Sequence, residues 1–154
     1  MMKDFMFYSP VALFFGNHCL EKNRHIFCAS GKKAFIITSH FPANCRNYAL
    51  EDVCGILDAA GIDICVYDHA EENPSVESVV EVVDAIRRYS PDFIFAVGGG
   101  SALDAAKAAA VFAANEDFAP RDIYTHKRKN ALPLVLIGTT AGTGSEVGRV
   151  GVLT

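Results

Sequence analysis

Apolar runs of strand length alternate along the chain with segments in which apolar residues recur at helical spacing. Four runs have the composition of buried strands, and they cover residues 34–38, 62–67, 93–97 and 134–137. Three segments between these runs have helical periodicity, and they cover about 45–60, 76–89 and 102–114. This alternation is typical of a parallel sheet whose crossover helices pack on its faces. The pattern therefore predicts an α/β fold.

The predicted helices carry local signals of their faces and ends. The apolar positions are Tyr48, Val53, Ile56 and Leu57 in the first helix and Val79, Val80, Val83 and Ile86 in the second. Gly61 stands where a glycine commonly ends a helix. The third helix is so rich in alanine that we expect it to pack very close to the sheet. Before the first strand, the apolar residues 11–15 predict a further strand at the sheet's edge.

Length and composition agree with one folded domain. A chain of 154 residues buries roughly 70% of the surface that it exposes when unfolded, without disulfides or metals. Its 51% apolar and 21% charged residues exclude disordered and fibrous classes. The 14 Lys and Arg against 18 Asp and Glu give a net charge of −4, with no basic stripe. We therefore expect no nucleic acid among its partners.

The sequence also bears on the compartment. It has no run of 18 apolar residues, so we expect no membrane span. Lys3 and Asp4 lie in an N-terminal stretch that lacks a signal-peptide cleavage pattern. The five cysteines form an odd set without a C-x-x-C pair, which favours reduced thiols that act as small hydrophobes. We expect a cytoplasmic protein.

The strand at 93–97 ends in a glycine triplet, Gly98, Gly99 and Gly100, which opens the alanine-rich helix. Ser101 is placed to cap that helix, and Ser101 and Asp104 have capping-box spacing. Free backbone N–H groups and the positive end of the helix dipole meet at such a turn, where an anion approaches without meeting a side chain. Phosphate is the expected guest, although a tight strand-to-helix turn explains the same glycines.

The last predicted strand runs into a second loop, residues 138–146. Its glycines let the backbone approach a ligand closely, and its hydroxyl side chains are Thr139, Thr140, Thr143 and Ser145. In open α/β sheets ligands bind outside the carboxyl ends of the strands, so we expect both loops at the same edge. The alternative interpretation is a flexible, solvated connection.

Three segments carry a family resemblance. FIFAVGGGSALDAAK at 93–107, PLVLIGTTAGTGSEV at 133–147 and ENP at 72–74 resemble, in order and spacing, the N-terminal domain of the iron-containing (group III) alcohol dehydrogenases. The resemblance covers nearly the whole chain. It implies a dehydroquinate synthase-like fold, in which a Rossmann-like parallel sheet with flanking helices binds NAD(P) and a following all-helical domain holds the metal.

The resemblance also implies roles for individual residues. Those that look like the family's pyrophosphate-binding turn are Gly98, Gly99, Gly100 and Ser101. Those that look like its cofactor loop, which reaches towards the nicotinamide end, are Thr139, Thr140, Thr143 and Ser145. Asn73 looks like its asparagine near the nucleotide. Asp104 and Lys107 match the pattern G-G-G-S-x-x-D-x-x-K, but Asp104 is also placed to cap the helix and Lys107 to face solvent.

Ser39, the residue after the first strand, bears on the choice between NAD and NADP. Members of the family that prefer NAD commonly carry an aspartate there for the ribose hydroxyls, whereas this chain has Thr38-Ser39-His40. A carboxylate repels a 2′-phosphate, so its absence leaves NADP open, and His40 or a nearby lysine favours it. We hypothesise that the chain tolerates NADP and that Ser39 contacts the cofactor.

The family's metal centre has no counterpart in this sequence. In the family an aspartate and three histidines of the helical domain bind Fe²⁺, or Zn²⁺ in some members, and the metal polarises the alcohol oxygen. The chain ends at Thr154, before any matching residues, so we expect no metal ligands. Asp122 and His126 imitate a ligand pair, but they lie among basic residues before the last strand and lack further ligands nearby.

The sequence predicts that residues 1–154 are the NAD(P)-binding domain of an oxidoreductase that transfers hydride between an alcohol and an aldehyde or ketone. We expect the chain to be incomplete, with the helical domain missing. The alternative is a stand-alone nucleotide-binding or scaffolding module without catalysis. Residues 147–154 depart from the family, and Gly148 and Gly151 are expected to loosen the strand there. A homo-oligomer is a further expectation, because a missing domain leaves apolar surface exposed.

Overall fold

The computed structural model describes residues 9–115, 117, 119, 122 and 130–154. Its strands are β1 (Lys33–Thr38), β2 (Asp63–Tyr67), β3 (Phe93–Gly98) and β4 (Leu134–Gly138). Its helices are α1 (Cys19–Lys22), α2 (Arg24–Cys28), α3 (Tyr48–Ala59), α4 (Val76–Tyr89) and α5 (Gly100–Ala113). The predicted strands agree with the structure to within one residue at each end.

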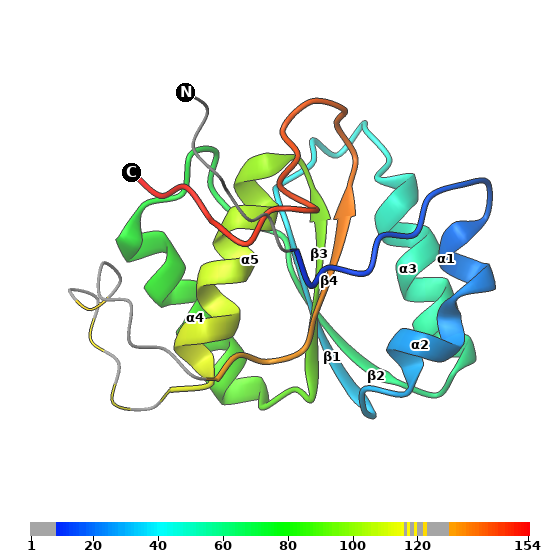
Figure 1. The fold of residues 1–154 in the computed structure, drawn as a ribbon, viewed down its shortest axis with the longest axis horizontal. Coiled ribbons are helices and arrows are strands. Elements are labelled where there is room, and N and C mark those ends of the chain that lie inside the picture. Colours follow the sequence, from blue (N-terminus) through cyan, green and yellow to red (C-terminus); the bar gives the residue numbers. More distant parts are fainter. Residues whose placement is uncertain (1–8, 116, 118, 120–121, 123–129) are drawn as a thin grey trace, which may run out of the picture.

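The four strands form one sheet in the order β2-β1-β3-β4, and every pair is parallel. The register places Thr38 beside Val97 and Gly98 beside Gly138. The carboxyl ends of the strands consequently lie at one edge, where the arrowheads of β3 and β4 point in Figure 1. The α/β class and the parallel sheet predicted from the sequence are confirmed.

Helices cover both faces of the sheet. Figure 1 shows α1, α2 and α3 on one face and α4 and α5 on the other. Alternate side chains of β3 divide between the two cores, because successive residues of a strand point to opposite faces. Ile94 packs with α4 and α5, whereas Phe95 packs with α2 and α3. The rings of Phe27 and Phe95 meet edge to face with centroids 5.2 Å apart, which fixes α2 against the sheet.

Helix α5 packs closely on the sheet, as its alanine content predicts. Ala102, Ala106 and Ala109 have no exposed surface. The capping prediction is wrong, because α5 begins two residues earlier than predicted: Gly99 holds the N-cap position and Ser101 lies inside the first turn. Gly61 follows α3 with a φ of 66°, the left-handed conformation that glycine adopts readily after a helix.

Three smaller sequence predictions need correction. Tyr48 is 65% exposed at the start of α3, where its ring contacts the Arg46 guanidinium instead of the core. The buried stripe of α4 contains Val82 rather than Val80, since the stripe follows positions 79, 82, 83 and 86. Residues 11–15 are not part of the four-stranded sheet, and Phe15 is 98% exposed.

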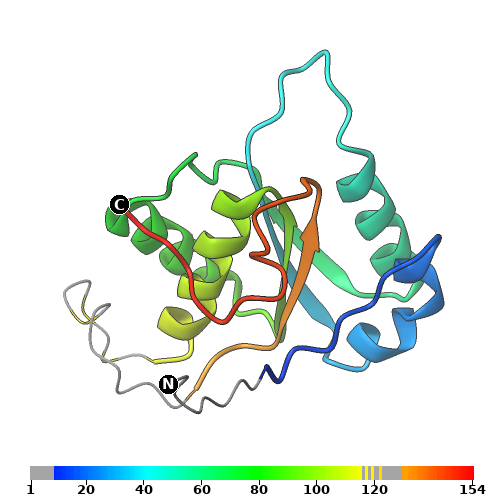
Figure 2. The ribbon, with the colours of Figure 1, turned by 45° about the horizontal axis from the view of Figure 1, so that its top comes forward.

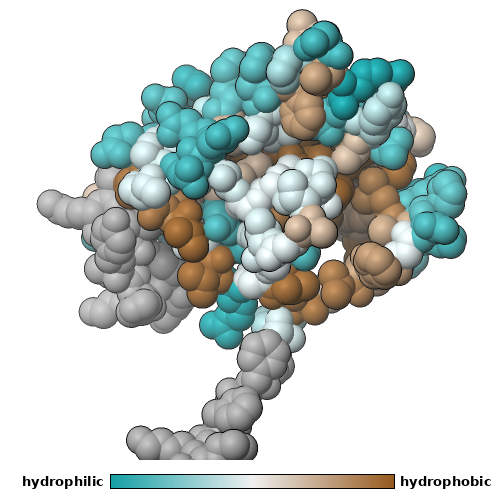
Figure 3. All heavy atoms as spheres, turned by 90° about the horizontal axis from the view of Figure 1, so that it is seen from above, coloured by the Kyte–Doolittle hydropathy of each residue, from teal (hydrophilic) through white to brown (hydrophobic). Residues whose placement is uncertain are grey.

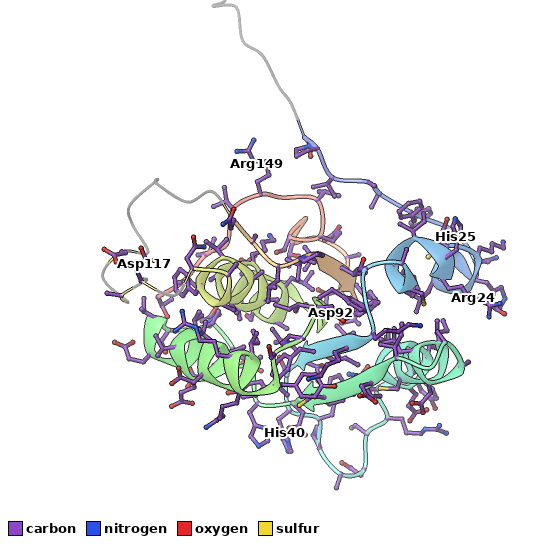
Figure 4. The ribbon with its side chains drawn as sticks, turned by 90° about the horizontal axis from the view of Figure 1, so that it is seen from below. Arg24, His25, His40, Asp92, Asp117 and Arg149 are labelled. Atoms are coloured by element: carbon purple, nitrogen blue, oxygen red, sulfur yellow. The ribbon has the colours of Figure 1, made fainter. Side chains whose placement is uncertain are left out.

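The amino edge of the sheet is held by Asp92, which precedes β3 (Figure 4). Its Oδ2 accepts the backbone N–H groups of Lys32, at 2.6 Å, and Lys33, at 3.0 Å. Gly31 has a φ of +158° and lies directly against the Asp92 side chain, where a Cβ would clash. None of the helices within the described ranges is long and apolar enough to cross a bilayer.

Candidate functional site

The strand order places a topological switch point at the carboxyl edge of the sheet. The chain passes from β1 outward to β2 and then returns to β3 on the other side of β1, and the crossover helices α3 and α4 lie on opposite faces. The switch point therefore lies between β1 and β3, which is where open α/β sheets bind ligands. Figure 3 views this edge, and pale, weakly polar surface occupies its centre beside apolar patches.

The glycine turn connects β3 to α5 at this edge. Gly98 ends β3, and a Cβ there would lie 2.9 Å from the Cβ of Ala102, so the helix starts too close for any other residue. Gly99 is extended, with φ −79° and ψ −175°, and has no side chain to cap α5. The N–H groups of the first helical turn are thus left without a capping side chain, which suits an anion.

The second loop packs directly on the glycine turn. A Cβ on Gly99 would lie 3.4 Å from Thr140 Oγ1, and one on Gly100 would lie 3.2 Å from Thr143 Cβ. The N–H of Thr139 donates to the carbonyl of Gly98 at 2.9 Å, which extends the pairing of β3 and β4 past the strand ends. The expectation that both loops lie at the same edge is confirmed, and Figure 2 shows the second loop beside the start of α5.

Asn73 reaches the same place from a third segment. Its φ of 52° is left-handed, and its backbone N–H donates to Ser101 Oγ at 3.1 Å. The hydroxyl of Thr154 donates to the Asn73 carbonyl at 3.0 Å. The turn at residues 72–75 is therefore tied both to the first turn of α5 and to the C-terminal segment. The structure brings Asn73 and Ser101 together through backbone and hydroxyl atoms.

Ser39 is half-buried at the end of β1, next to His40. The His40 and His69 rings lie 6.2 Å apart, and the His69 and Tyr67 rings lie 5.9 Å apart. His69 Nδ1 pairs with Asp68 Oδ1 at 2.5 Å. The contribution of β2 was missed from the sequence. Tyr67 ends a predicted strand and His69 follows it, but that pattern does not show that β2 lies beside β1.

The phenol of Tyr67 is protonated at neutral pH. Burial raises its pKa, and the carboxylates of Glu81, Glu71 and Asp68 raise it further. The ends of β1 and β2 thus combine a phenol O–H, two histidine rings and nearby carboxylates. These side chains can both donate hydrogen bonds to a polar group on a ring of a bound ligand and accept hydrogen bonds from it.

Asp104 and Lys107 form a partly buried cluster with Ser145. Their side chains are only 13% and 10% exposed. Lys107 Nζ donates to Asp104 Oδ1 at 3.0 Å and to Ser145 Oγ at 2.8 Å, while the Ser145 hydroxyl itself donates to Asp104 Oδ1. The capping role for Asp104 and the solvent-facing role for Lys107 are both wrong, because the second loop covers these side chains.

The Asp104 carboxyl is ionised well below neutral pH. Burial alone raises its pKa, but hydrogen bonds from Ser145, the Val152 N–H and Lys107, together with the Lys107 charge, outweigh burial. The pKa of Asp104 therefore lies below its ordinary value. One acceptor nearby is left open: Glu146 Oε2 is buried without a hydrogen-bond partner in the described part of the chain.

The donor set at this edge does not suit a metal. Within the described ranges, no three His, Cys, Asp or Glu side chains are grouped so as to hold a metal ion. Of the pair Asp122 and His126, His126 lies outside the described residues. Hydroxyl, glycine and helix N-terminal groups dominate instead, and these suit an anionic, hydroxyl-rich ligand.

The parallel order, the helices on both faces and the two glycine loops define a doubly wound, Rossmann-like α/β domain. Residues 10–154 match the family model described as iron-containing alcohol dehydrogenase. The chain belongs to the iron-containing alcohol dehydrogenase family, so the resemblance seen in the sequence is confirmed.

Three known proteins illustrate the likeness. An iron-containing alcohol dehydrogenase from Thermotoga maritima matches with a TM-score of 0.90 and 41% identity, over 97% of this chain and 42% of its own. The probable NADH-dependent butanol dehydrogenase 2 of Bacillus subtilis is 34% identical over 99% of this chain and 39% of its own length. The NADPH-dependent butanol dehydrogenase of Clostridium saccharobutylicum is 31% identical over 94% and 37%. This chain spans less than half the length of each.

Proposed function

We propose that this chain binds NAD(P) at the carboxyl edge of its sheet. The observation that carries the proposal is the contact of Thr140 and Thr143 with Gly99 and Gly100, which joins the two loops into one cradle at the uncapped start of α5. A pyrophosphate needs backbone N–H donors, a positive helix end and no intervening side chain, and this cradle supplies all three.

The proposed contacts with the cofactor lie along this cradle. Gly98, Gly99, Gly100 and Ser101 receive the pyrophosphate, and Asn73 borders the nucleotide. Thr139, Thr140 and Thr143 line the path towards the nicotinamide, and Ser39 meets the adenosine ribose at the switch point. Ser145 and Asp104 belong to the same site, but their side chains bond to each other and to Lys107. A bound nicotinamide ring supplies the hydride acceptor or donor for an alcohol and its aldehyde or ketone.

We propose that residues 1–154 form the cofactor-binding domain of such an oxidoreductase. The matched relatives are more than twice as long, and the described residues contain no metal-ligand group. The Fe²⁺ or Zn²⁺ ligands and the surface that holds the alcohol are therefore assigned to a helical domain outside these residues. Turnover of a primary alcohol by this chain alone, with added Fe²⁺ or Zn²⁺, would overturn the assignment of the metal ligands and the alcohol-binding surface to another domain.

The proposed cofactor choice includes NADP. Ser39 and His40 follow β1, and neither carries a carboxylate. His69 lies beside His40. The matched relatives include one named for NADH and one named for NADPH, so the family accommodates both. Thermal denaturation with matched NAD and NADP tests the choice, because a ligand at 100 times its Kd adds about 2.7 kcal/mol to stability. A shift with NAD alone would refute NADP tolerance.

Two further proposals concern the setting of the protein. All five cysteines are free thiols, which supports the reducing environment of the cytoplasm. Leu13, Phe15 and Val150 are largely exposed apolar side chains, which supports self-association or cover by further polypeptide. Sedimentation at several protein concentrations tests for a homo-oligomer.

A further inference from the structure

We infer that Asp104 and Lys107 act as a latch that positions the second loop for the cofactor rather than contacting the cofactor themselves. The latch is defined as the side chains of Asp104, Lys107 and Ser145. This inference rests on the proposed function of the two loops. Its claim that the latch holds the second loop in place concerns the chain without any ligand.

The charged atoms of the latch form their hydrogen bonds within the chain. Lys107 Nζ has three protons and three acceptors: Asp104 Oδ1, Ser145 Oγ and, at 2.9 Å, the carbonyl of Val150. Asp104 uses both carboxylate oxygens, since Oδ1 accepts from Lys107 and Ser145 and Oδ2 accepts the Val152 N–H at 3.0 Å. Lys107 Nζ therefore has no proton left for a phosphate, and the ionised Asp104 carboxylate only accepts hydrogen bonds and cannot donate one to a phosphate.

The latch connects the end of the second loop with the C-terminal segment that follows it. Ser145 lies in the second loop, whereas Val150 and Val152 lie in the C-terminal segment that runs along α5 (Figure 2). Gly151 presses against the backbone of α5, where a Cβ would lie 3.0 Å from the Asp104 carbonyl oxygen. Gly151 therefore allows a close approach, and it does not loosen a strand as the sequence suggested. Arg149 points outward, away from the latch (Figure 4).

A short series of contacts connects the latch to the proposed cofactor cradle. The Ser145 N–H donates to Thr143 Oγ1 at 3.3 Å, and Thr143 packs on Gly100 at the start of α5. Releasing Ser145 therefore frees Thr143 to leave the glycine turn. Because Ser145 is 8% exposed and the pair is mostly buried, the latch is more than a solvated surface ion pair.

The charges of the pair also matter to an anionic ligand. Asp104 and Lys107 together are neutral, so the closed latch adds no net charge beside the pyrophosphate. Removing Lys107 alone would leave a partly buried carboxylate that repels phosphate and lacks a partner. Among the described residues, Lys107 is the charged side chain that influences the ionisation of Asp104.

The test compares Asp104→Asn, Lys107→Met and the double variant with Asp84→Asn, the same chemical change at an exposed position of α4. Backbone hydrogen exchange of residues 139–148 is measured without cofactor, and the Kd for NAD⁺ and NADP⁺ is measured by calorimetry. We expect faster exchange of the loop in the latch variants and a Kd raised by about tenfold, the usual scale for removing a coupled pair. Lys107→Met should weaken binding more than the double variant.

A pH series separates positioning from mere loss of stability. The Kd of the wild type should rise as the pH falls through the lowered pKa of Asp104, whereas the Asp104→Asn variant should lack that step. Wild-type exchange and Kd in the latch variants would overturn the latch while leaving the proposed function intact. Faster exchange with an unchanged Kd would also overturn its positioning role. Failure of the wild type to bind either cofactor would instead refute the proposed function.

Discussion

Thr143 packs on Gly100 so closely that a Cβ on the glycine would lie 3.2 Å from the Cβ of the threonine. This contact joins the loop after β4 to the turn after β3. It gives the carboxyl edge one continuous surface of glycines and hydroxyls instead of two separate loops. The shape of the proposed cofactor site therefore depends on Gly99 and Gly100, two neighbouring positions that leave different amounts of space for a Cβ.

The first prediction compares these two glycines. Gly99→Ala places its methyl group in ordinary contact with Thr140, so the variant should fold as the wild type does. That methyl group lies on the surface proposed for the pyrophosphate, and we expect the Kd for NAD(P) to rise at least about tenfold, the factor that corresponds to 1.4 kcal/mol. Gly100→Ala should lower both cofactor affinity and Tm, because Thr143 must move.

Gly55→Ala is the matched control for the glycine variants. Gly55 lies exposed in α3, and nothing lies within 4 Å of the position that a Cβ would take. Alanine there should stabilise the fold by roughly 0.5–1 kcal/mol without changing cofactor affinity. Equal loss of binding in Gly55→Ala and Gly99→Ala would contradict the proposed location of the pyrophosphate.

The second prediction concerns Asp92. Backbone N–H groups of Lys32 and Lys33 lower the pKa of this carboxyl, so it favours folding most at pH values above its ordinary pKa of about 3.9. Its contribution disappears as the pH falls through the lowered pKa. The difference in Tm between the wild type and Asp92→Ala should stay constant from pH 8 to pH 5 and shrink below about pH 4. A difference that grows on acidification would contradict this assignment.

The third prediction tests the close packing of α5. Ala106 has no exposed surface, so Ala106→Leu must push the helix from the sheet and should cost about 1–3 kcal/mol in the free energy of unfolding. The same substitution at Ala59, which is exposed at the end of α3, should change stability by less than about 0.5 kcal/mol. Urea denaturation of both variants measures the difference. Equal stabilities would show that α5 does not pack as described.

The fourth prediction concerns the ribose end. Ser39→Asp introduces a carboxylate at the end of β1, which should raise the Kd for NADP⁺ by more than the Kd for NAD⁺, because it repels the 2′-phosphate. Calorimetric titration with both cofactors gives the ratio. An unchanged ratio would place the 2′-phosphate away from Ser39 and His40.

The sequence predicts the strands well because parallel strands are buried on both faces. β1 and β3 appear as plain apolar runs whose limits are visible without knowing any partner. Helix faces are harder, since periodicity shows a stripe but not where its edges fall, as Val80 and Val82 illustrate. Residues 11–15 are apolar and yet lie outside the sheet, because an apolar run does not by itself supply a strand to pair with.

The site was predicted in part. The two glycine loops are visible in sequence, because glycines and hydroxyls directly follow strand ends. The bonding of Asp104 and Lys107 to Ser145 was not visible, because Ser145 lies 41 residues after Asp104 and only the sheet order brings them together. Asp104 therefore looked like a cap or a ligand residue. The neighbour relation of His40 and His69 likewise needed the pairing of β1 with β2.

An NMR titration of the ¹⁵N-labelled chain with NAD⁺ and NADP⁺ shows directly whether the two loops form the cofactor site. If NAD(P) binds at the two loops, backbone amides of residues 98–101 and 139–145 shift together along one saturable curve, while those near Asp92 at the opposite edge do not. No saturable shift with either cofactor, or shifts confined to residues away from the two loops, would contradict this placement of the cofactor.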